Sequence, residues 1–300
     1  MVKRGLIAMG GMQITVVGAA GKMGALFTKY LLKQRHKVFV HDMNKAGLRR
    51  LTRIGAKIVD DLKFTIMNSD AVILCVPINA TKRVMLQVSK YMMIDSTLIE
   101  ISSIKHETHK TLIEVARLYK LKPLCIHPLF GPGAEGIKGM KVALAPVLNI
   151  KAELRNAKKI LKGASFVTVD VDEHDKKIAV VLGLTHLTSA ILAKILADER
   201  ELDSFNDVAG TTYRLQSMLT ESIMNDDVEL FTSLLISNSY TRRYARSLLK
   251  ATEQMCKYVI NDNPRGLSNT YVRIQEKLGR KVNLEKSYQE MYEVLKTLKR

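Results

Sequence analysis

Residues 13–24 read QITVVGAAGKMG, and this stretch decides the fold. An apolar run, Gln13–Gly18, ends in a glycine-rich turn that opens a helical pattern, Lys22–Lys33. The spacing approaches GxGxxG, in which backbone N–H groups at a helix N-terminus bind a pyrophosphate. Ala19 stands at the first glycine position, and Gly18 lies one residue earlier. The alternative is a tight turn without a ligand. The residues expected at a dinucleotide site are Gly18, Ala19, Gly21, Lys22, Met23 and Gly24.

Short apolar runs rich in Val and Ile alternate with helical patterns up to about residue 170. Runs without polar alternation are typical of strands buried on both faces. The expected strands are Gln13–Gly18, Lys37–His41, Ala71–Val76, Thr97–Ile101, Pro123–His127, Lys141–Ala145 and Ser165–Val169. The helical patterns include Lys22–Lys33, Ala80–Tyr91 and Glu107–Tyr119. This order predicts an α/β protein with a doubly wound, mostly parallel Rossmann sheet.

The chain from Glu173 onward reads as long helices without a convincing strand. Their expected ranges are Glu173–Ala197, Ser204–Ser222, Val228–Leu235, Ser239–Val259, Pro264–Lys277 and Leu284–Leu298. Ile178–Leu192 is almost uncharged, so we expect that helix to be buried on most sides. We therefore expect a dinucleotide-binding Rossmann domain over residues 12–171 and an all-helical substrate and dimerisation domain over residues 172–300. A homodimer through the helical half follows from the same apolar stretch.

The net charge is +18, and most of it lies in residues 1–150, with 23 Lys and Arg against 9 Asp and Glu. These basic residues are scattered singly among helix positions, without a basic run interleaved with aromatics. We therefore expect no nucleic-acid binding. A basic first half would instead attract anionic dinucleotides and dicarboxylate substrates.

Cysteine usage and apolar runs define the expected compartment. Cys75, Cys125 and Cys256 lack CxxC spacing, so neither disulfides nor a metal site is expected, and a reducing cytoplasm fits. No run approaches the roughly 18 apolar residues of a spanning helix, so we expect no membrane. Lys3 and Arg4 before an apolar stretch imitate a secretory signal, but those apolar residues also form the first strand. We expect the first eleven residues to be a loose leader.

Asp42 ends the second expected strand. A carboxylate there can accept hydrogen bonds from the adenosine ribose and repel a 2′-phosphate, which favours NAD. Alternatively, Asp42 caps a helix that begins near Lys45. Lys45, Arg49 and Arg50 follow closely and could hold the phosphate of NADP, so both cofactors remain open.

Three further polar segments, residues 76–81, 100–105 and 127–132, follow the carboxyl ends of expected strands, where ligands bind in open α/β sheets. Together with the glycine turn they resemble the prephenate dehydrogenase family, most closely its short archaeal-type members, over about residues 13–260. The matching elements, in the family's order, are Gly21-Lys22-Met23-Gly24, Val76-Pro77, Ser103-Ile104-Lys105, His127-Pro128, Glu173-His174-Asp175 and Thr185-His186-Leu187.

The resemblance implies NAD(P)-dependent oxidative decarboxylation of prephenate to 4-hydroxyphenylpyruvate, in tyrosine biosynthesis. His127 matches the family's catalytic His, and a neutral His is the natural acceptor for the proton of the ring hydroxyl. Ser103 matches a catalytic Ser that hydrogen-bonds this hydroxyl and the His. His186 matches a substrate-binding His, with Thr185 in the position of the family's Ser. Val76-Pro77 matches an element expected beside the cofactor.

Each of these residues also has a structural interpretation. His127 could be inert before a rigid proline, Ser103 could be a turn or cap residue, and His186 could be a hydrogen-bonded core histidine. We interpret His174 as a helix-start residue rather than a catalyst.

The chain departs from the family pattern where the substrate is expected to bind. Ser189 stands where the family has the second His of the helix segment. We still expect Ser189 to be a substrate-binding residue. The family's Asp-x-x-Arg is not reproduced, because Asp207 is followed by an arginine only at Arg214. Prephenate carries two carboxylates, for which bidentate arginine pairing is suited. Arg214 is the expected partner, and Arg242 with Arg243 is the alternative.

Other departures and rivals keep the substrate open. Residues 131–133 read Gly-Pro-Gly where the family has Gly-Thr-Glu. No fused chorismate mutase or regulatory domain is apparent, so no feedback control through one is expected. The rivals are an arogenate dehydrogenase, a β-hydroxyacid dehydrogenase using Lys176, Lys177 or Lys194, and a dinucleotide-binding sensor without catalysis.

Overall fold

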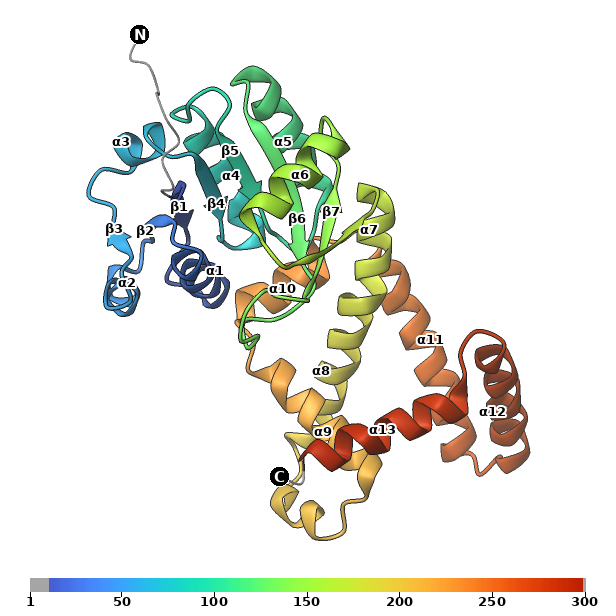
Figure 1. The fold of residues 1–300 in the computed structure, drawn as a ribbon. Helices are drawn as coiled ribbons and strands as arrows, with labels where there is room; N and C mark the ends of the chain where they lie inside the picture. Colours follow the sequence, from blue (N-terminus) through green and yellow to red (C-terminus); the bar gives the residue numbers. More distant parts are fainter. Residues whose placement is uncertain (1–10, 299–300) are drawn as a thin grey trace. The chain divides into compact units, whose positions relative to one another are not determined.

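The computed structural model describes residues 11–298, which form two compact units (Figure 1). The first unit runs to Ile178 and also contains Thr232–Asn238, and the second holds Ala179–Phe231 and the chain from Ser239. The domain boundary expected at residue 172 stays a prediction. The leader expected over the first eleven residues lies, except for Gly11, outside the described part of the chain.

The first unit is built on one eight-stranded sheet of order β3-β2-β1-β4-β5-β6-β7-β8. Neighbouring strands are parallel except β6 and β7, which are antiparallel. The strand order changes direction between β1 and β4, as in a doubly wound nucleotide-binding sheet. The predicted α/β class with a mostly parallel Rossmann sheet is confirmed. The strands are β1 Gln13–Val17, β2 Lys37–His41, β3 Lys57–Ile58, β4 Ala71–Leu74, β5 Thr97–Glu100, β6 Lys122–Pro128, β7 Lys141–Ala145 and β8 Ser165–Thr168.

Helices cover both faces of this sheet, which is why the central strand β4 is apolar at every position. In β4, Ala71 and Ile73 pack into a cluster with α1 and α6, whereas Val72 and Leu74 pack into another with α4 and α5. Each fully buried side chain of the size of Val or Leu contributes roughly 1.5–3 kcal/mol. The helices are α1 Lys22–Lys33, α2 Lys45–Thr52, α3 Leu62–Met67, α4 Ile78–Ser89, α5 His106–Leu118, α6 Ile150–Ile160 and α7 Val171–Ile178.

The second unit is helical, as expected, but two of its helices differ from the prediction. The helix expected from Glu173 to Ala197 contains a π-helical stretch, Ala179–Leu184, before α8 Thr185–Leu196. The helix expected from residue 204 is broken, because extended backbone at Gly210 separates a 3₁₀ turn from α9. The remaining elements are η2 Leu202–Asp207, α9 Thr211–Met224, α10 Val228–Ile236, α11 Thr241–Ile260, α12 Pro264–Gly279 and α13 Leu284–Leu298.

The apolar helical stretch Val171–Leu196 is more exposed than the sequence predicted. Only 22% of its most apolar window is buried, and Val181 and Ile195 are 61% and 57% exposed. The expectation that this helix is buried on most sides is therefore wrong for the single chain. By length and composition alone, with a mean hydropathy of 1.8, it would suffice to cross a membrane, so the expectation that no such run exists is also wrong. The absence of a membrane stays a prediction.

Candidate functional site

The turn after β1 requires glycine at two positions. Gly18 has a φ of +83°, and a Cβ there would lie 2.3 Å from the carbonyl oxygen of Cys75. A Cβ at Gly24 would lie 2.2 Å from the carbonyl oxygen of Gly18, so only glycine lets α1 begin this close to the strand. Gly18 thus makes the tight turn. Ala19, which stands at the first glycine of the pattern, is fully buried in the core.

The N-terminus of α1 is open to an anionic ligand. Gly21 is the N-cap residue, no side chain caps the helix, and its first turn holds no acidic residue. A Cβ at Gly21 would meet only the carbonyl oxygen of Gly18, at 3.5 Å. Lys22 is exposed, whereas Met23 is half-buried against the core. Backbone N–H groups without a side-chain cap at a helix N-terminus fit a pyrophosphate.

Asp42 holds the glycine turn in place. Its Oδ2 accepts a hydrogen bond from Ala20 N at 2.9 Å, and its Oδ1 accepts one from Asn44 N at 2.8 Å. The side chain that caps α2 belongs to Asn44, which accepts from Gly47 N, so the helix-cap alternative for Asp42 is wrong. Arg50 also contacts the turn, donating to the carbonyl oxygen of Ala20 at 2.7 Å. Asp42 retains free lone pairs for ribose hydroxyls.

Val76 and Pro77 leave the carboxyl end of β4 beside the same turn. A Cβ at Gly18 would meet Cγ1 of Val76 at 3.0 Å, which places Val76 against the glycine turn. Pro77 is exposed and is the N-cap residue of α4. The structure thus brings the predicted cofactor residues to one edge of the sheet.

His127 lies near the end of β6 and is 4% exposed. Its Nδ1 lies 3.0 Å from Nε2 of His174, and the two rings meet edge to face with centroids 5.2 Å apart. Burial lowers the pKa of His127 well below its ordinary 6.5, with further contributions from the positive charge of Lys105 and from His174. The imidazole is therefore neutral at neutral pH, as a proton acceptor must be.

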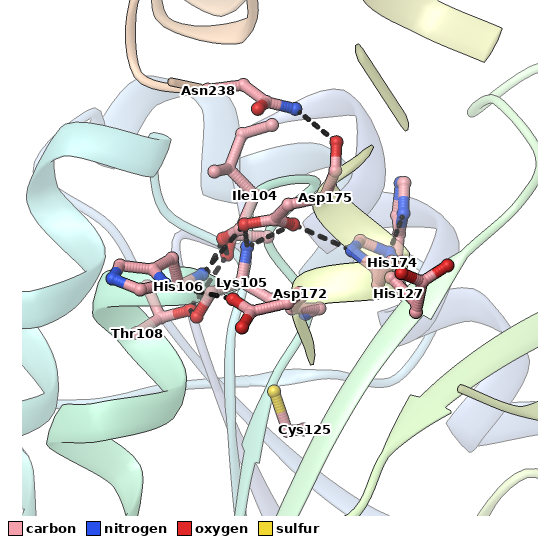
Figure 2. Close-up of polar contacts among 12 residues, drawn as sticks. Ile104, Lys105, His106, Thr108, Cys125, His127, Asp172, His174, Asp175 and Asn238 are labelled. Atoms are coloured by element: carbon pink, nitrogen blue, oxygen red, sulfur yellow. Dashed lines mark hydrogen bonds and ion pairs between the residues drawn. The ribbon is translucent and has the colours of Figure 1, made fainter. Parts of the chain in front are cut away.

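His174 is in turn tied to Asp175, as Figure 2 shows. Nδ1 of His174 lies 2.8 Å from Oδ1 of Asp175, and both side chains are buried. The Asp175 carboxylate also accepts hydrogen bonds from the backbone N–H groups of Lys105 and His106, at 3.0 and 2.9 Å. His174 lies in the first helix after β8, as expected, but nothing in the sequence pairs it with His127. The adjacent acidic residue was the signal available.

A buried ion pair supports the loop between β5 and α5. Nζ of Lys105 lies 2.5 Å from Oε2 of Glu100 and donates to the carbonyl oxygen of Ile126 at 2.6 Å. Glu100 also accepts from the hydroxyl of Ser102 and from the thiol of Cys125. Burial raises the pKa of Cys125, so this thiol stays protonated and donates. All of these side chains are buried, and the loop they fix carries Ser103.

Ser103 is half-buried in that loop. In the described part of the chain no hydrogen bond joins it to His127, and the neighbouring Ser102 instead bonds to Glu100 and to the carbonyl oxygen of Ile104. The structure therefore places Ser103 in the loop after β5 and His127 near the end of the adjacent strand β6, and no hydrogen bond among the described residues joins the two. A catalytic role for Ser103 stays a prediction.

The four predicted substrate-binding residues belong to the second unit. His186 is 15% exposed at its side chain, with Nδ1 2.8 Å from the carbonyl oxygen of Leu182 and Nε2 3.7 Å from Oδ2 of Asp226. Nδ1 therefore donates to the helix backbone, and Nε2 faces a carboxylate. The other three differ in exposure: Thr185 is half-buried, Ser189 is buried and Arg214 is exposed.

Two family models match adjacent parts of the chain. The nucleotide-binding domain of prephenate dehydrogenase matches residues 27–171, and the dimerization domain of prephenate dehydrogenase matches residues 170–271. Together they span both halves of the chain in the family's order.

Curated relatives and solved structures agree with this match. The probable arogenate/prephenate dehydrogenase of Methanocaldococcus jannaschii is 24% identical over 84% of this chain, and the chain spans 58% of that relative's length. The T-protein of Haemophilus influenzae is 21% identical over 89% of this chain and 67% of its own length.

Two solved structures share the fold. The prephenate dehydrogenase of A. aeolicus, in complex with hydroxyphenyl propionate and NAD+, is 19% identical, with a TM-score of 0.69, over 90% of this chain and 98% of its own. The Synechocystis arogenate dehydrogenase is 18% identical, with a TM-score of 0.64, over 90% of this chain and 100% of its own. With its two domains matched in order by the family models, this chain belongs to the prephenate dehydrogenase family.

Proposed function

We propose that this protein is an NAD-dependent dehydrogenase that oxidatively decarboxylates prephenate to 4-hydroxyphenylpyruvate. The observation that carries the proposal is the buried, neutral imidazole of His127 at the carboxyl end of β6. The same sheet carries a glycine turn whose helix N-terminus fits a dinucleotide pyrophosphate. Membership of the prephenate dehydrogenase family supports the reaction class.

The reaction needs a base and a hydride acceptor. NAD, when bound, supplies the hydride acceptor. His127 accepts the proton of the ring hydroxyl while the hydride leaves the carbon that bears it. The bond to the ring carboxylate then breaks as carbon dioxide is lost. Its electron pair enters the ring, whose oxygen regains a proton as the phenol forms. His127 thus needs to be neutral at the start, which its burial ensures.

NAD is the proposed cofactor because of Asp42. Its carboxylate lies beside the glycine turn, bonded to Ala20 N, where it would repel a 2′-phosphate. Lys45 and Arg49 are exposed on α2 and are the groups that would hold such a phosphate. We assign the discrimination to Asp42.

The test is an assay of reduced nicotinamide by absorbance, with purified full-length protein. Prephenate and arogenate are each tried with NAD and with NADP. We expect the fastest turnover with prephenate and NAD, and a loss of about 10²–10⁴-fold in kcat for His127→Asn. Faster turnover of arogenate than of prephenate would identify the protein as an arogenate dehydrogenase instead. Absence of turnover with either substrate, in protein that binds the dinucleotide, would refute the proposed reaction.

The exposed apolar helix supports a homodimer as the working form. Val181, Ile191 and Ile195 are 61%, 42% and 57% exposed in the single chain, and the matched dimerization domain contains them. Association of two copies would bury such residues, and each Å² of apolar surface removed from water would contribute a favourable free energy of roughly 25 cal/mol. Light scattering should give twice the mass of the chain at micromolar concentration. A monomer mass at every concentration would contradict the dimer. We also propose a cytoplasmic location, because the proposed reaction belongs to amino-acid biosynthesis.

A further inference from the structure

Three side chains of the first unit form a buried polar chain that ends at the proposed base. We propose that Asp175 and His174 are positioning residues that fix the tautomer of His127, so that its Nε2 atom is the one that accepts the proton. The proposal rests on the proposed function, in which His127 is the base. The chain runs from Asp175 through His174 to Nδ1 of His127, as Figure 2 shows.

The direction of each hydrogen bond follows from the groups that surround Asp175. A carboxylate can only accept, and it receives the backbone N–H groups of Lys105 and His106. Nδ1 of His174, at 2.8 Å, must therefore carry its hydrogen toward Asp175. We take His174, which is 3% exposed, as a neutral imidazole; its other nitrogen then has no hydrogen, so Nε2 of His174 is an acceptor.

The same logic passes to the next ring. The acceptor Nε2 of His174 faces Nδ1 of His127 at 3.0 Å, so Nδ1 of His127 carries the hydrogen. Nε2 of His127 is then left with its lone pair, which is the state a general base needs. Without His174, either nitrogen of His127 could carry the hydrogen, and a fraction of the protein would present a blocked base.

The chain is held by three separate parts of the first unit. The start of α5 and its N-cap residue supply the two backbone N–H groups, α7 supplies Asp175 and His174, and β6 supplies His127. Nδ2 of Asn238 donates to the backbone carbonyl of Asp175 at 2.8 Å and ties in the segment Thr232–Asn238. Asp175, His174 and His127 are each at most 4% exposed. Buried and multiply bonded groups of this kind hold one orientation.

Burial and the positive charge of Lys105 disfavour the imidazolium that forms when His127 takes up the substrate proton. The carboxylate of Glu100, bonded to the ammonium of Lys105, offsets part of that positive charge. Asp175 is the second carboxylate near His127 that can offset the imidazolium. The Asp175 carboxylate acts on His127 through His174, which donates to Asp175 and accepts from Nδ1 of His127.

Asp175→Asn is the sharpest test, because the surroundings dictate how the amide must lie. Its oxygen is favoured at the position of Oδ2, which lies 3.2 and 2.9 Å from the backbone N atoms of Lys105 and His106, and this leaves the NH₂ group toward Nδ1 of His174. His174 then carries its hydrogen on Nε2 and donates to Nδ1 of His127, which forces the hydrogen of His127 onto Nε2. We expect kcat to fall by about 10²–10⁴-fold, as for removal of the base, with KM changed less than about threefold. Asp172→Asn, an exposed acid on the same helix, is the matched control and should behave as wild type.

His174 offers a removal and a rescue. His174→Phe keeps a ring but offers no acceptor to His127, so kcat should fall by at least about tenfold. His174→Gln restores an acceptor, because its amide oxygen can receive the hydrogen of Nδ1 of His127. Its kcat should recover most of that loss. If His174 had a purely structural role, His174→Gln would have no higher kcat than His174→Phe. Equal kcat values for these two variants would overturn the proposal.

The tautomer itself is measurable without turnover. In ¹⁵N-labelled full-length protein, long-range ¹H–¹⁵N correlation spectra distinguish protonated from unprotonated ring nitrogens. The signals of His127 are assigned by their loss in His127→Asn. We expect an unprotonated Nε2 in wild type and a protonated Nε2 in Asp175→Asn. Protonated Nε2 in the wild type would refute the proposal. If neither substrate is turned over but the spectra are as expected, the proposed reaction fails and the positioning chain stands. If Asp175→Asn does not fold, the proposal is tested by the wild-type spectrum and by the kcat values of His174→Phe and His174→Gln.

Discussion

Lys105 and Glu100 form a fully buried ion pair, with Nζ 2.5 Å from Oε2 and side chains 1% and 0% exposed. The pair lies between the end of β5 and the loop that carries Ser103, and the carbonyl oxygen of Ile126 in β6 receives a second bond from Nζ. Removing one partner of a buried pair leaves an uncompensated charge, which is strongly destabilising. The loop geometry around the proposed base thus depends on two charges that water does not reach.

Glu100→Gln should lower the free energy of unfolding by about 3–5 kcal/mol, because the Lys105 ammonium would lose its counter-charge. Urea unfolding followed by circular dichroism measures the change. The control is Glu107→Gln, which removes an exposed partner of Lys82 and should cost at most about 1 kcal/mol. Equal stabilities of the two variants would show that the buried pair is not a stabilising contact.

Gly24→Ala and Gly21→Ala should separate folding from cofactor binding. The Cβ at residue 24 would lie 2.2 Å from a backbone oxygen, so we expect a loss of about 1–3 kcal/mol in stability. At residue 21 the nearest atom is 3.5 Å away, so the stability should stay near wild type. A methyl group there would nevertheless stand where the pyrophosphate approaches, and NADH affinity by fluorescence titration should fall at least about tenfold. Unchanged affinity in Gly21→Ala would remove this turn from the cofactor site.

The rate with prephenate should stay on its plateau below pH 6.5. The pKa of His127 is depressed in the folded protein, by burial first and then by Lys105 and His174. A depressed pKa means that the neutral base persists as the pH falls through the ordinary value of 6.5, and activity is lost only at lower pH. The pH profile of kcat/KM reports this limb for the free enzyme. A limb at or above 6.5 would contradict the assignment of His127 as the base.

Asp42→Asn should shift the cofactor preference toward NADP. The amide oxygen can still accept the hydrogen bond from Ala20 N, so the glycine turn keeps that bond, whereas the bond from Asn44 N is lost. The repulsion of a 2′-phosphate disappears, and Lys45 and Arg49 remain exposed nearby. We expect the ratio of kcat/KM for NAD over NADP to fall by about tenfold or more, which corresponds to roughly 1.4 kcal/mol. A ratio that does not move would assign the discrimination to other residues.

The sheet could be predicted because its strands are buried on both faces. Runs such as Ala71–Leu74 have no polar residue and are bounded by helical patterns, so one sequence suffices to place them. Strand β3 was missed because it has only two residues, Lys57 and Ile58, both exposed at the sheet edge. The break before α9 was missed because η2 ends at Asp207 and α9 begins at Thr211, so only a short segment with Gly210 separates the two helical elements.

The candidate site was predicted less completely than the sheet. The sequence placed His127 at the carboxyl end of an apolar strand, and the resemblance to the family implied its catalytic role. His174 could not be paired with it, because 47 positions separate the two and the contact depends on how α7 packs. Only one part of the role of Asp42 could be predicted, because a carboxylate at a strand end suggests a ribose contact. Its bonds to Ala20 and Asn44 depend on the folded turn and could not be predicted.

The first unit is discontinuous in sequence, and this has a consequence for biosynthesis. Its last segment, Thr232–Asn238, is synthesised about sixty residues after Ile178, and domains form from the N-terminus at roughly 5–20 residues per second on the ribosome. For about 3–12 seconds the nascent sheet is therefore present while Asn238 is not yet available to Asp175. A shortened gene product ending at residue 178 would remain in that incomplete state permanently.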